Sequence, residues 1–122
     1  MVASLLKPGG RIILIDEHPI LSCLWVENGQ LQIIDDYFRR AEPMEVRGWY
    51  HFKGGEDARE TKFEFTWPVS DVITSLIHAG LTIEQFIEYP GGPDWRLCQA
   101  QGKIDHLPGH YLVVARKTGE QR

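Results

Sequence analysis

The strongest constraint on the fold of this chain lies in residues 5–19, where a helix-ending turn leads directly into an unbroken apolar run. Pro8 prevents the preceding helix from continuing, and the glycines after it can take the positive φ angles that end a helix. The apolar run at 12–15 then predicts a strand covered on both faces, as in a parallel sheet with helices on each side.

The composition is that of a single domain that binds neither nucleic acid nor membrane. Of its 122 residues, 43% are hydrophobic and 25% are charged, so we expect a folded core rather than disorder. The net charge of −4 argues against non-specific nucleic-acid binding, which needs a basic face. No apolar run approaches the roughly 20 residues that span a bilayer. Cys23 and Cys98 are too few for a disulfide framework, so we expect a cytoplasmic protein.

The middle of the chain reads as an insertion between the elements of a sheet. Residues 31–36 and 63–67 alternate apolar and polar side chains, which predicts the two strands of an inserted hairpin.

One helix and two strands are expected after this insertion. The helix begins near Val69 and ends at Gly80, where a glycine takes the conformation of a helix stop. Residues 81–88 and 111–116 then form strands. The apolar stripe of the helix consists of Val69, Val72, Ile73, Leu76 and Ile77.

Three segments resemble consecutive parts of class I S-adenosylmethionine-dependent methyltransferases. The sequence LLKPGG at 5–10, with the strand after it, resembles the family's late helix and fifth strand. AGLTIE at 79–84 resembles the exit from its last helix into the sixth strand, and LVVARK at 112–117 resembles its final strand. In that family the seventh strand returns antiparallel between the fifth and the sixth.

One bacterial subgroup of that family is similar at further places in the same order. These are EHP at 17–19, YF at 37–38 followed by EP at 42–43, and FEFTW at 63–67. Trp67 stands where that subgroup often has histidine, so no role of that histidine is carried over.

The resemblance implies an α/β fold, or α+β for an isolated fragment. The chain would be the C-terminal part of a Rossmann-like methyltransferase sheet, from the fifth strand to the last, with an inserted β-hairpin. It would form a single domain over residues 1–122, in which residues 19–68 are an inserted region on the substrate side.

The cofactor half of such an enzyme has no counterpart in the sequence. The family's glycine-rich loop needs a strand before it and a helix after it, and none of the glycine pairs stands in that order. The resemblance implies S-adenosylmethionine for the complete enzyme. For the isolated chain we expect neither cofactor binding nor activity.

A substrate pocket is expected where the strands end, because ligands of such sheets bind beyond their carboxyl ends. Methyl transfer asks the protein to position the nucleophile and to accept its proton. The aromatic residues can equally be core, and the carboxylates can be strand ends or helix caps. The pocket candidates are Asp16, Glu17, His18, Tyr37, Tyr50, His51, Trp67, Tyr89 and Trp95, with Trp25 and Trp49 as further aromatic walls.

Metal and hydrolase chemistry are disfavoured by the spacing of the reactive residues. His106 and His110 have the H-x3-H spacing, but Pro108 and Gly109 break the helix that presents such a pair. No nucleophile sits in a G-x-S-x-G elbow.

A fragment of this kind would leave the strand at 11–16 with an unpaired apolar edge, from Arg11 to Asp16. We therefore expect a homodimer through this edge, although the inserted hairpin could fold over the exposed surface instead. Two functions remain open. The chain is either the substrate-side part of a small-molecule methyltransferase, or a non-catalytic small-molecule-binding or dimerisation domain derived from that fold.

Overall fold

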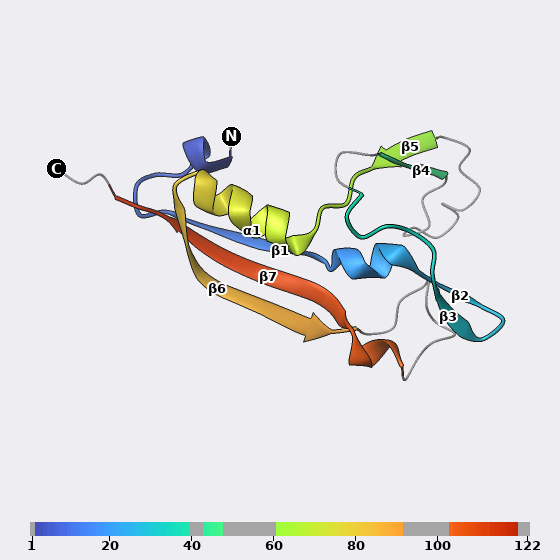
Figure 1. Ribbon diagram of the computed structural model, residues 1–122. Helices are drawn as coiled ribbons and strands as arrows, with labels where there is room; N and C mark the ends of the chain where they lie inside the picture. The colour runs from blue at the N-terminus through green and yellow to red at the C-terminus, as the bar shows by residue number, and fades with distance from the viewer. Residues whose placement is uncertain (1, 40–42, 48–60, 92–102, 120–122) are drawn as a thin grey trace.

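The computed structural model describes residues 2–39, 43–47, 61–91 and 103–119 (Figure 1). Most of its regular structure is strand, with one α-helix and short 3₁₀ helices, marked η. In chain order the elements are η1 (Val2–Leu5), β1 (Arg11–Glu17), η2 (Pro19–Cys23), β2 (Leu24–Glu27), β3 (Gln30–Ile33), β4 (Met44–Arg47), β5 (Thr61–Glu64), α1 (Val69–His78), β6 (Leu81–Pro90), η5 (Ile104–His106) and β7 (Pro108–Lys117).

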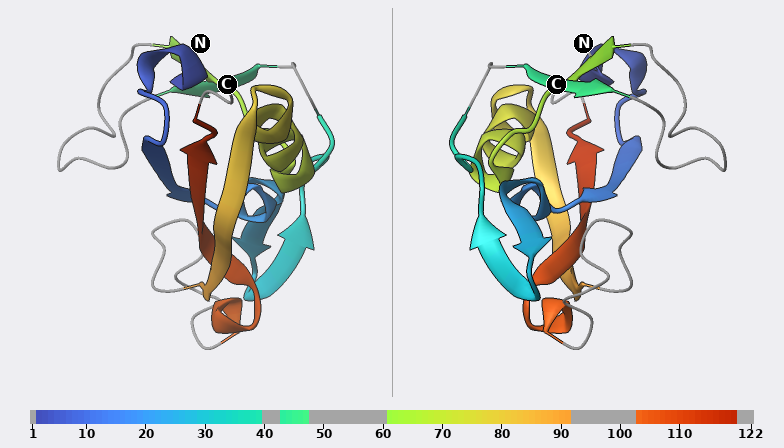
Figure 2. Two further views of the ribbon diagram at one scale, coloured as in Figure 1. Left: turned by 90° about the vertical axis from the view of Figure 1, so that its left-hand side faces the viewer. Right: turned by 90° about the vertical axis from the view of Figure 1, so that its right-hand side faces the viewer.

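The centre of the fold is a three-stranded sheet in the order β1-β7-β6 (Figure 2). Both pairings are antiparallel, with Arg11 opposite Arg116 and Leu81 opposite Lys117. The two outer strands therefore run parallel to each other and end on the same side of the molecule. This is the order that the methyltransferase resemblance implies for its fifth, seventh and sixth strands.

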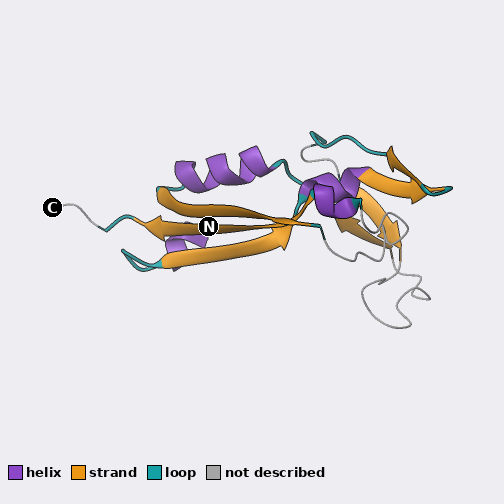
Figure 3. Cartoon of the chain, turned by 90° about the horizontal axis from the view of Figure 1, so that it is seen from below, coloured by secondary structure: helices purple, strands orange, loops and turns teal. Residues whose placement is uncertain are grey.

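The expectation that β1 is covered on both faces was wrong for this chain. Its paired neighbour β7 is antiparallel, and the side chains of Ile13 and Ile15 are 65% and 64% exposed. The alternate residues Ile12 and Leu14 are half-buried on the side of α1. Figure 3 shows the three long strands side by side, with no described helix in front of them. Only one face of the sheet is covered because the chain supplies a single α-helix among its described residues.

The helix and the last two strands are predicted correctly, with small differences at their ends. α1 begins at Val69, and Gly80 follows it with a φ of 84°. On the face toward α1, Val113 and Ala115 are fully buried in the middle of the sheet. Ile77 is 53% exposed, so the apolar stripe of α1 is only partly covered. No described helix is long and apolar enough to cross a membrane.

A β-bulge at Glu84 ties the two edge strands together. Ile83 is opposite Ala115 and Gln85 is opposite Val114, which leaves Glu84 without a cross-strand partner. Its carboxylate accepts hydrogen bonds from Arg11 on β1, on the far side of β7. The extra residue keeps the strand's apolar side chains facing α1 on both sides of the bulge.

The insertion is not the single hairpin that the sequence pattern predicted. Its strands lie in two separate two-stranded sheets, β2-β3 and β4-β5. The first is closed by Asn28 and Gly29, which both have positive φ and match the two-residue hairpin turn. The pattern at 31–36 therefore pairs with the preceding segment rather than with 63–67, because a local two-residue turn costs less entropy than a long loop.

A second small core lies beyond the carboxyl ends of β1 and β6. It consists of Leu21, Leu24, Val26 and Ile104, so it joins η2 and β2 to η5. The chain leaves β6 at Gly91 and re-enters β7 near Gly109, and these two glycines are in close contact. The Gly109 carbonyl also accepts a hydrogen bond from the His18 backbone N–H at 2.9 Å, which fixes the end of β1.

We predict that Gly109→Ala destabilises the protein. A Cβ at Gly109 would lie 2.6 Å from the Gly91 Cα, so the backbone must shift, at a cost of about 1–3 kcal/mol. The free energy of unfolding from urea titration measures the effect. Gly119→Ala is the matched control, because a Cβ there has no heavy atom within 4 Å. Equal stability of the two variants would contradict the close contact.

Candidate functional site

His18 is the buried polar residue at the end of β1, with 6% of its surface exposed. Its Nδ1 accepts a hydrogen bond from the Ile20 N–H at 3.2 Å, which caps η2. Its Nε2 lies 3.0 Å from a carboxylate oxygen of Glu88 on β6. The ring stacks on Tyr37 at 6.5 Å and meets Tyr111 edge-on at 6.1 Å between ring centroids. His18 therefore connects η2, the Tyr37 segment and the sheet.

These contacts define the tautomer of His18. Because Nδ1 accepts a backbone N–H, the neutral ring carries its proton on Nε2 and donates it to Glu88. Both ring nitrogens are thus occupied by contacts within the protein. A proton-accepting role would require one of these hydrogen bonds to break, so the geometry favours a positioning role for His18.

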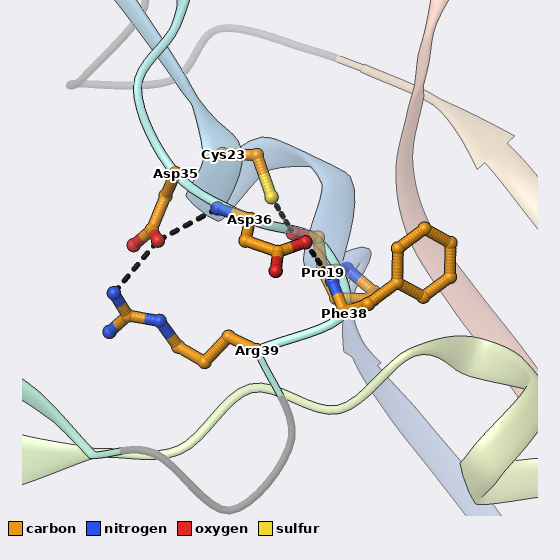
Figure 4. Close-up of polar contacts among 6 residues, drawn as sticks. All are labelled: Pro19, Cys23, Asp35, Asp36, Phe38 and Arg39. Atoms are coloured by element: carbon orange, nitrogen blue, oxygen red, sulfur yellow. Dashed lines mark hydrogen bonds and ion pairs between the residues drawn. The ribbon is translucent and has the colours of Figure 1, made fainter.

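A turn held by two aspartates follows β3, and Tyr37 belongs to this segment. Figure 4 shows the hydrogen bonds of Asp35 and Asp36. Asp35 accepts hydrogen bonds from the Asp36 N–H and from the Arg39 guanidinium, both at 2.8 Å. Asp36 accepts one from the Phe38 N–H at 2.9 Å. These bonds place the Tyr37 hydroxyl where it accepts a hydrogen bond from the Val69 N–H at 3.0 Å. The α1 N-terminus is therefore capped by a residue far from it in sequence.

A layer of polar side chains crosses the sheet beside His18. Asp16, Tyr111 and Glu88 are opposite one another on β1, β7 and β6. Partial burial raises the pKa of the Asp16 carboxyl, an effect that His110 opposes. Burial and the Asp16 carboxylate both raise the pKa of Tyr111, so its hydroxyl keeps its proton at neutral pH. The layer thus offers two carboxylates as acceptors and one phenol as a donor.

An apolar cavity of about 570 Å³ lies next to this layer, between β1 and α1. Ile12 and Leu14 form its wall on β1, and Val72 and Leu76 form its wall on α1. Trp67 stands at the start of α1, where the cavity approaches the polar layer. A small molecule with an apolar body and a polar group would fit this combination of surfaces.

The structure brings together four of the residues that the sequence singled out. Asp16, His18 and Tyr37 lie in or beside the polar layer, and Trp67 lines the cavity. By contrast, β-sheet alternation places Glu17 and Tyr89 on the face away from α1, where both are opposite His110. Trp25 is on β2 and is 41% exposed. The expectations for Trp49, Tyr50, His51 and Trp95 lie outside the described residues.

Sequence reasoning missed Glu88 and Tyr111 as members of the site. Glu88 had a usable signal, because it lies near the end of a strand that runs parallel to β1, and the two carboxyl ends must meet at one side of the sheet. Tyr111 had none, since its placement depends on the antiparallel return of β7.

The other reactive groups do not assemble into a centre. Among residues 2–39, 43–47, 61–91 and 103–119, no three His, Cys, Asp or Glu side chains are grouped as metal ligands. Cys23 is a free, buried thiol whose Sγ lies 3.7 Å from the Pro19 carbonyl oxygen. Burial and the nearby Asp35 and Asp36 raise the pKa of the Cys23 thiol, which disfavours a nucleophilic role.

Comparison with known proteins finds a similar solved structure, an S-adenosylmethionine-dependent methyltransferase from Mesorhizobium loti. The TM-score is 0.53 and the sequence identity is 25%. The fold is methyltransferase-like. The match covers 95% of this chain and 55% of that chain, so the present chain spans about half the length of that methyltransferase. No protein-family model matches the sequence, and neither does any curated protein.

We predict that Tyr37→Phe destabilises the protein by about 1 kcal/mol, the usual cost of removing a side-chain acceptor at a helix N-terminus. The Val69 N–H loses its 3.0 Å hydrogen bond while the ring contact with His18 remains. Tyr89→Phe is the control, because Tyr89 is exposed on the opposite face. Chemical unfolding of both variants measures the difference, and an equal loss in Tyr89→Phe would contradict the capping role.

We also predict that Asp16→Asn removes a pH-dependent penalty. The folded state raises the Asp16 pKa, so it binds this proton more tightly than the unfolded state does. This residue therefore contributes stability at low pH that is lost as pH rises from the ordinary aspartate pKa of 3.8 through the raised pKa. The Asn oxygen can still accept the Glu17 N–H. Relative to wild type, the variant should gain stability on going from acid to neutral pH; a pH-independent difference would contradict the shift.

Proposed function

We propose that this chain is the C-terminal, substrate-side part of a class I S-adenosylmethionine-dependent methyltransferase that acts on a small molecule. The observation that carries the proposal is the structural match to a methyltransferase over 95% of this chain but only 55% of the other. We further propose that the isolated chain has no methyltransferase activity.

The strand order supports the assignment of this chain to the C-terminal part of a class I enzyme. β7 lies antiparallel between β1 and β6, as the resemblance implies for the seventh strand of a class I enzyme. In this reading β1 is the fifth strand of a Rossmann-like sheet that continues beyond its free edge. Residues 19–68 leave from the carboxyl end of β1, which is where the substrate side of such a sheet lies.

The described residues do not fit the methionine part of the cofactor. That group needs a glycine loop after a strand and before a helix. Gly9 and Gly80 stand in the reverse order, between a helix and a strand, and Gly29 turns a hairpin. α1 begins after Trp67 and Pro68 with no glycine before it. We therefore propose that the cofactor site belongs to the other half of the enzyme.

The substrate-side assignment rests on the cavity and the polar layer together. The cavity offers apolar walls from Leu14, Val72 and Trp67, while Asp16 and Glu88 offer carboxylates at the sheet end. Holding a nucleophile in line with a methyl donor is the main task of a methyltransferase, and a carboxylate can accept the proton released. Cys23, a free buried thiol, supports the proposed cytoplasmic location.

A second candidate function is a non-catalytic domain that binds a small molecule. The observation in its favour is that the cavity between β1 and α1 is built from the residues of this chain alone. Binding of a small apolar molecule in the absence of S-adenosylmethionine would favour this function. Loss of that binding in Trp67→Ala, without loss of folding, would place the ligand in the cavity.

We predict that calorimetric titration of the chain with S-adenosylhomocysteine gives no binding heat at millimolar ligand. The reason is that the described glycines are not placed to form a cofactor loop. Binding at micromolar affinity would contradict the assignment of the cofactor site to another half. As the matching positive test, the coding sequence next to this chain should encode a strand, a glycine-rich loop and a helix, and the joined polypeptide should bind the same ligand.

A further inference from the structure

β1 is an apolar edge strand with backbone groups available for pairing. It bonds to β7 on one side, and no other described strand pairs with it (Figure 2). Ile13 and Ile15 are well exposed on the open face. Exposed, flat and apolar edges of this kind are templates for strand addition. The features that usually block such edges, lysine, proline or a bulge, are absent from Arg11–Glu17.

The direction of the backbone groups follows from the bonds that flank β1. The Gly10 carbonyl accepts from the Lys117 N–H, and the His18 N–H donates to the Gly109 carbonyl. In an antiparallel ladder the same alternation continues between them, so even-numbered residues bond to β7. The N–H and carbonyl groups of Arg11, Ile13 and Ile15 therefore point to the free edge. At the end of the strand, the Asp16 carboxylate already accepts the Glu17 N–H.

The sequence of β1 is complementary to itself when it runs antiparallel. With a two-fold axis at Leu14, Arg11 faces Glu17 of the partner subunit, and Ile13 faces Ile15 of the partner subunit. On the open face, charges then meet opposite charges and isoleucines meet isoleucines. On the face toward α1, Leu14 meets Leu14 of the partner subunit, and Ile12 meets Asp16 of the partner subunit. A shift to the neighbouring register places Arg11 against the partner's Ile15, or Ile13 against the partner's Glu17. Of these registers, only the Leu14-centred one pairs opposite charges and also pairs isoleucine with isoleucine on the open face.

We propose that the free edge of β1 binds a second copy of this chain, antiparallel and with its two-fold axis at Leu14. The result is a continuous six-stranded sheet, twice the three strands of one chain, with both α1 helices on the same face. Leu14 also lines the cavity between β1 and α1, so the axis brings the two cavities side by side. Arg11 keeps its Glu84 contact and gains a second carboxylate on its exposed side.

The same edge cannot pair with a second copy and with another strand at once. A methyltransferase half joined to this chain would compete for β1, so the dimer belongs to the chain without that half. The proposal needs no cofactor and no substrate, and its test is independent of the proposed methyltransferase function.

The first test is sedimentation equilibrium of the wild-type chain at micromolar concentrations. We expect a monomer–dimer equilibrium, and Ile13→Lys should weaken it at least about tenfold because a lysine opposes edge pairing. Ile87→Lys is the matched control, since it adds the same charge on β6, the opposite edge of the sheet. A monomeric wild-type chain would overturn the proposal, as would equal weakening by both variants.

The second test concerns the register. Arg11→Glu and Glu17→Arg each create two like-charge pairs across the axis, so each variant alone should dimerise about tenfold more weakly than wild type. A mixture of the two variants restores opposite charges at both pairs and should form a heterodimer of near wild-type affinity. This complementation also shows that both variants fold. Failure of the mixture to associate, while wild type dimerises, would overturn the Leu14-centred register.

Discussion

The antiparallel return of β7 between β1 and β6 is the interaction on which the rest of the structure depends. It joins the first and last described strands of the chain and buries Val113 and Ala115 at the centre of the sheet. Because both outer strands pair with β7, they run in the same direction and end together. That shared end is where His18 reaches Glu88 and where the second core of η2 and η5 forms.

Among the described residues, the sheet is covered on one face and open at the β1 edge, and this asymmetry is the main functional information in the fold. An open cavity lies between α1 and β1 on one face, whereas Ile13 and Ile15 are exposed on the other. An exposed apolar strand edge of this kind is a surface on which another strand can pair. Two observations bear on the exposed edge of β1. One is the partial match to a longer methyltransferase, and the other is the complementary sequence of β1. We propose that another part of an enzyme or a second copy of the chain pairs with this edge.

Some residues in and beside the polar layer stabilise the fold, and others are available to a ligand. His18 is committed to Ile20 and Glu88, and Tyr37 is committed to the start of α1. These residues hold the inserted region against the sheet. Asp16 and Trp67 face the more open part of the site, where a ligand would find a carboxylate beside apolar walls. The candidate site is therefore a small group of polar side chains next to an apolar cavity.

The sequence by itself determined the elements that depend on residues close together in the chain, such as the α-helix and the tight turn. The helix that begins at Val69 and stops before Gly80 follows from apolar periodicity and from the conformation of glycine. The Asn28-Gly29 turn also has a local sequence signal, which the strand pattern at 31–36 obscured. Pairing was different. Which strands meet, which face Glu17 and Tyr89 take, and the approach of Glu88 to His18 all depend on strand pairing. That pairing joins residues that are 21 positions apart for Tyr89 and His110 and 105 apart for Arg11 and Arg116. Only the tertiary structure decided these, because a one-residue shift in register moves every side chain to the opposite face of the sheet.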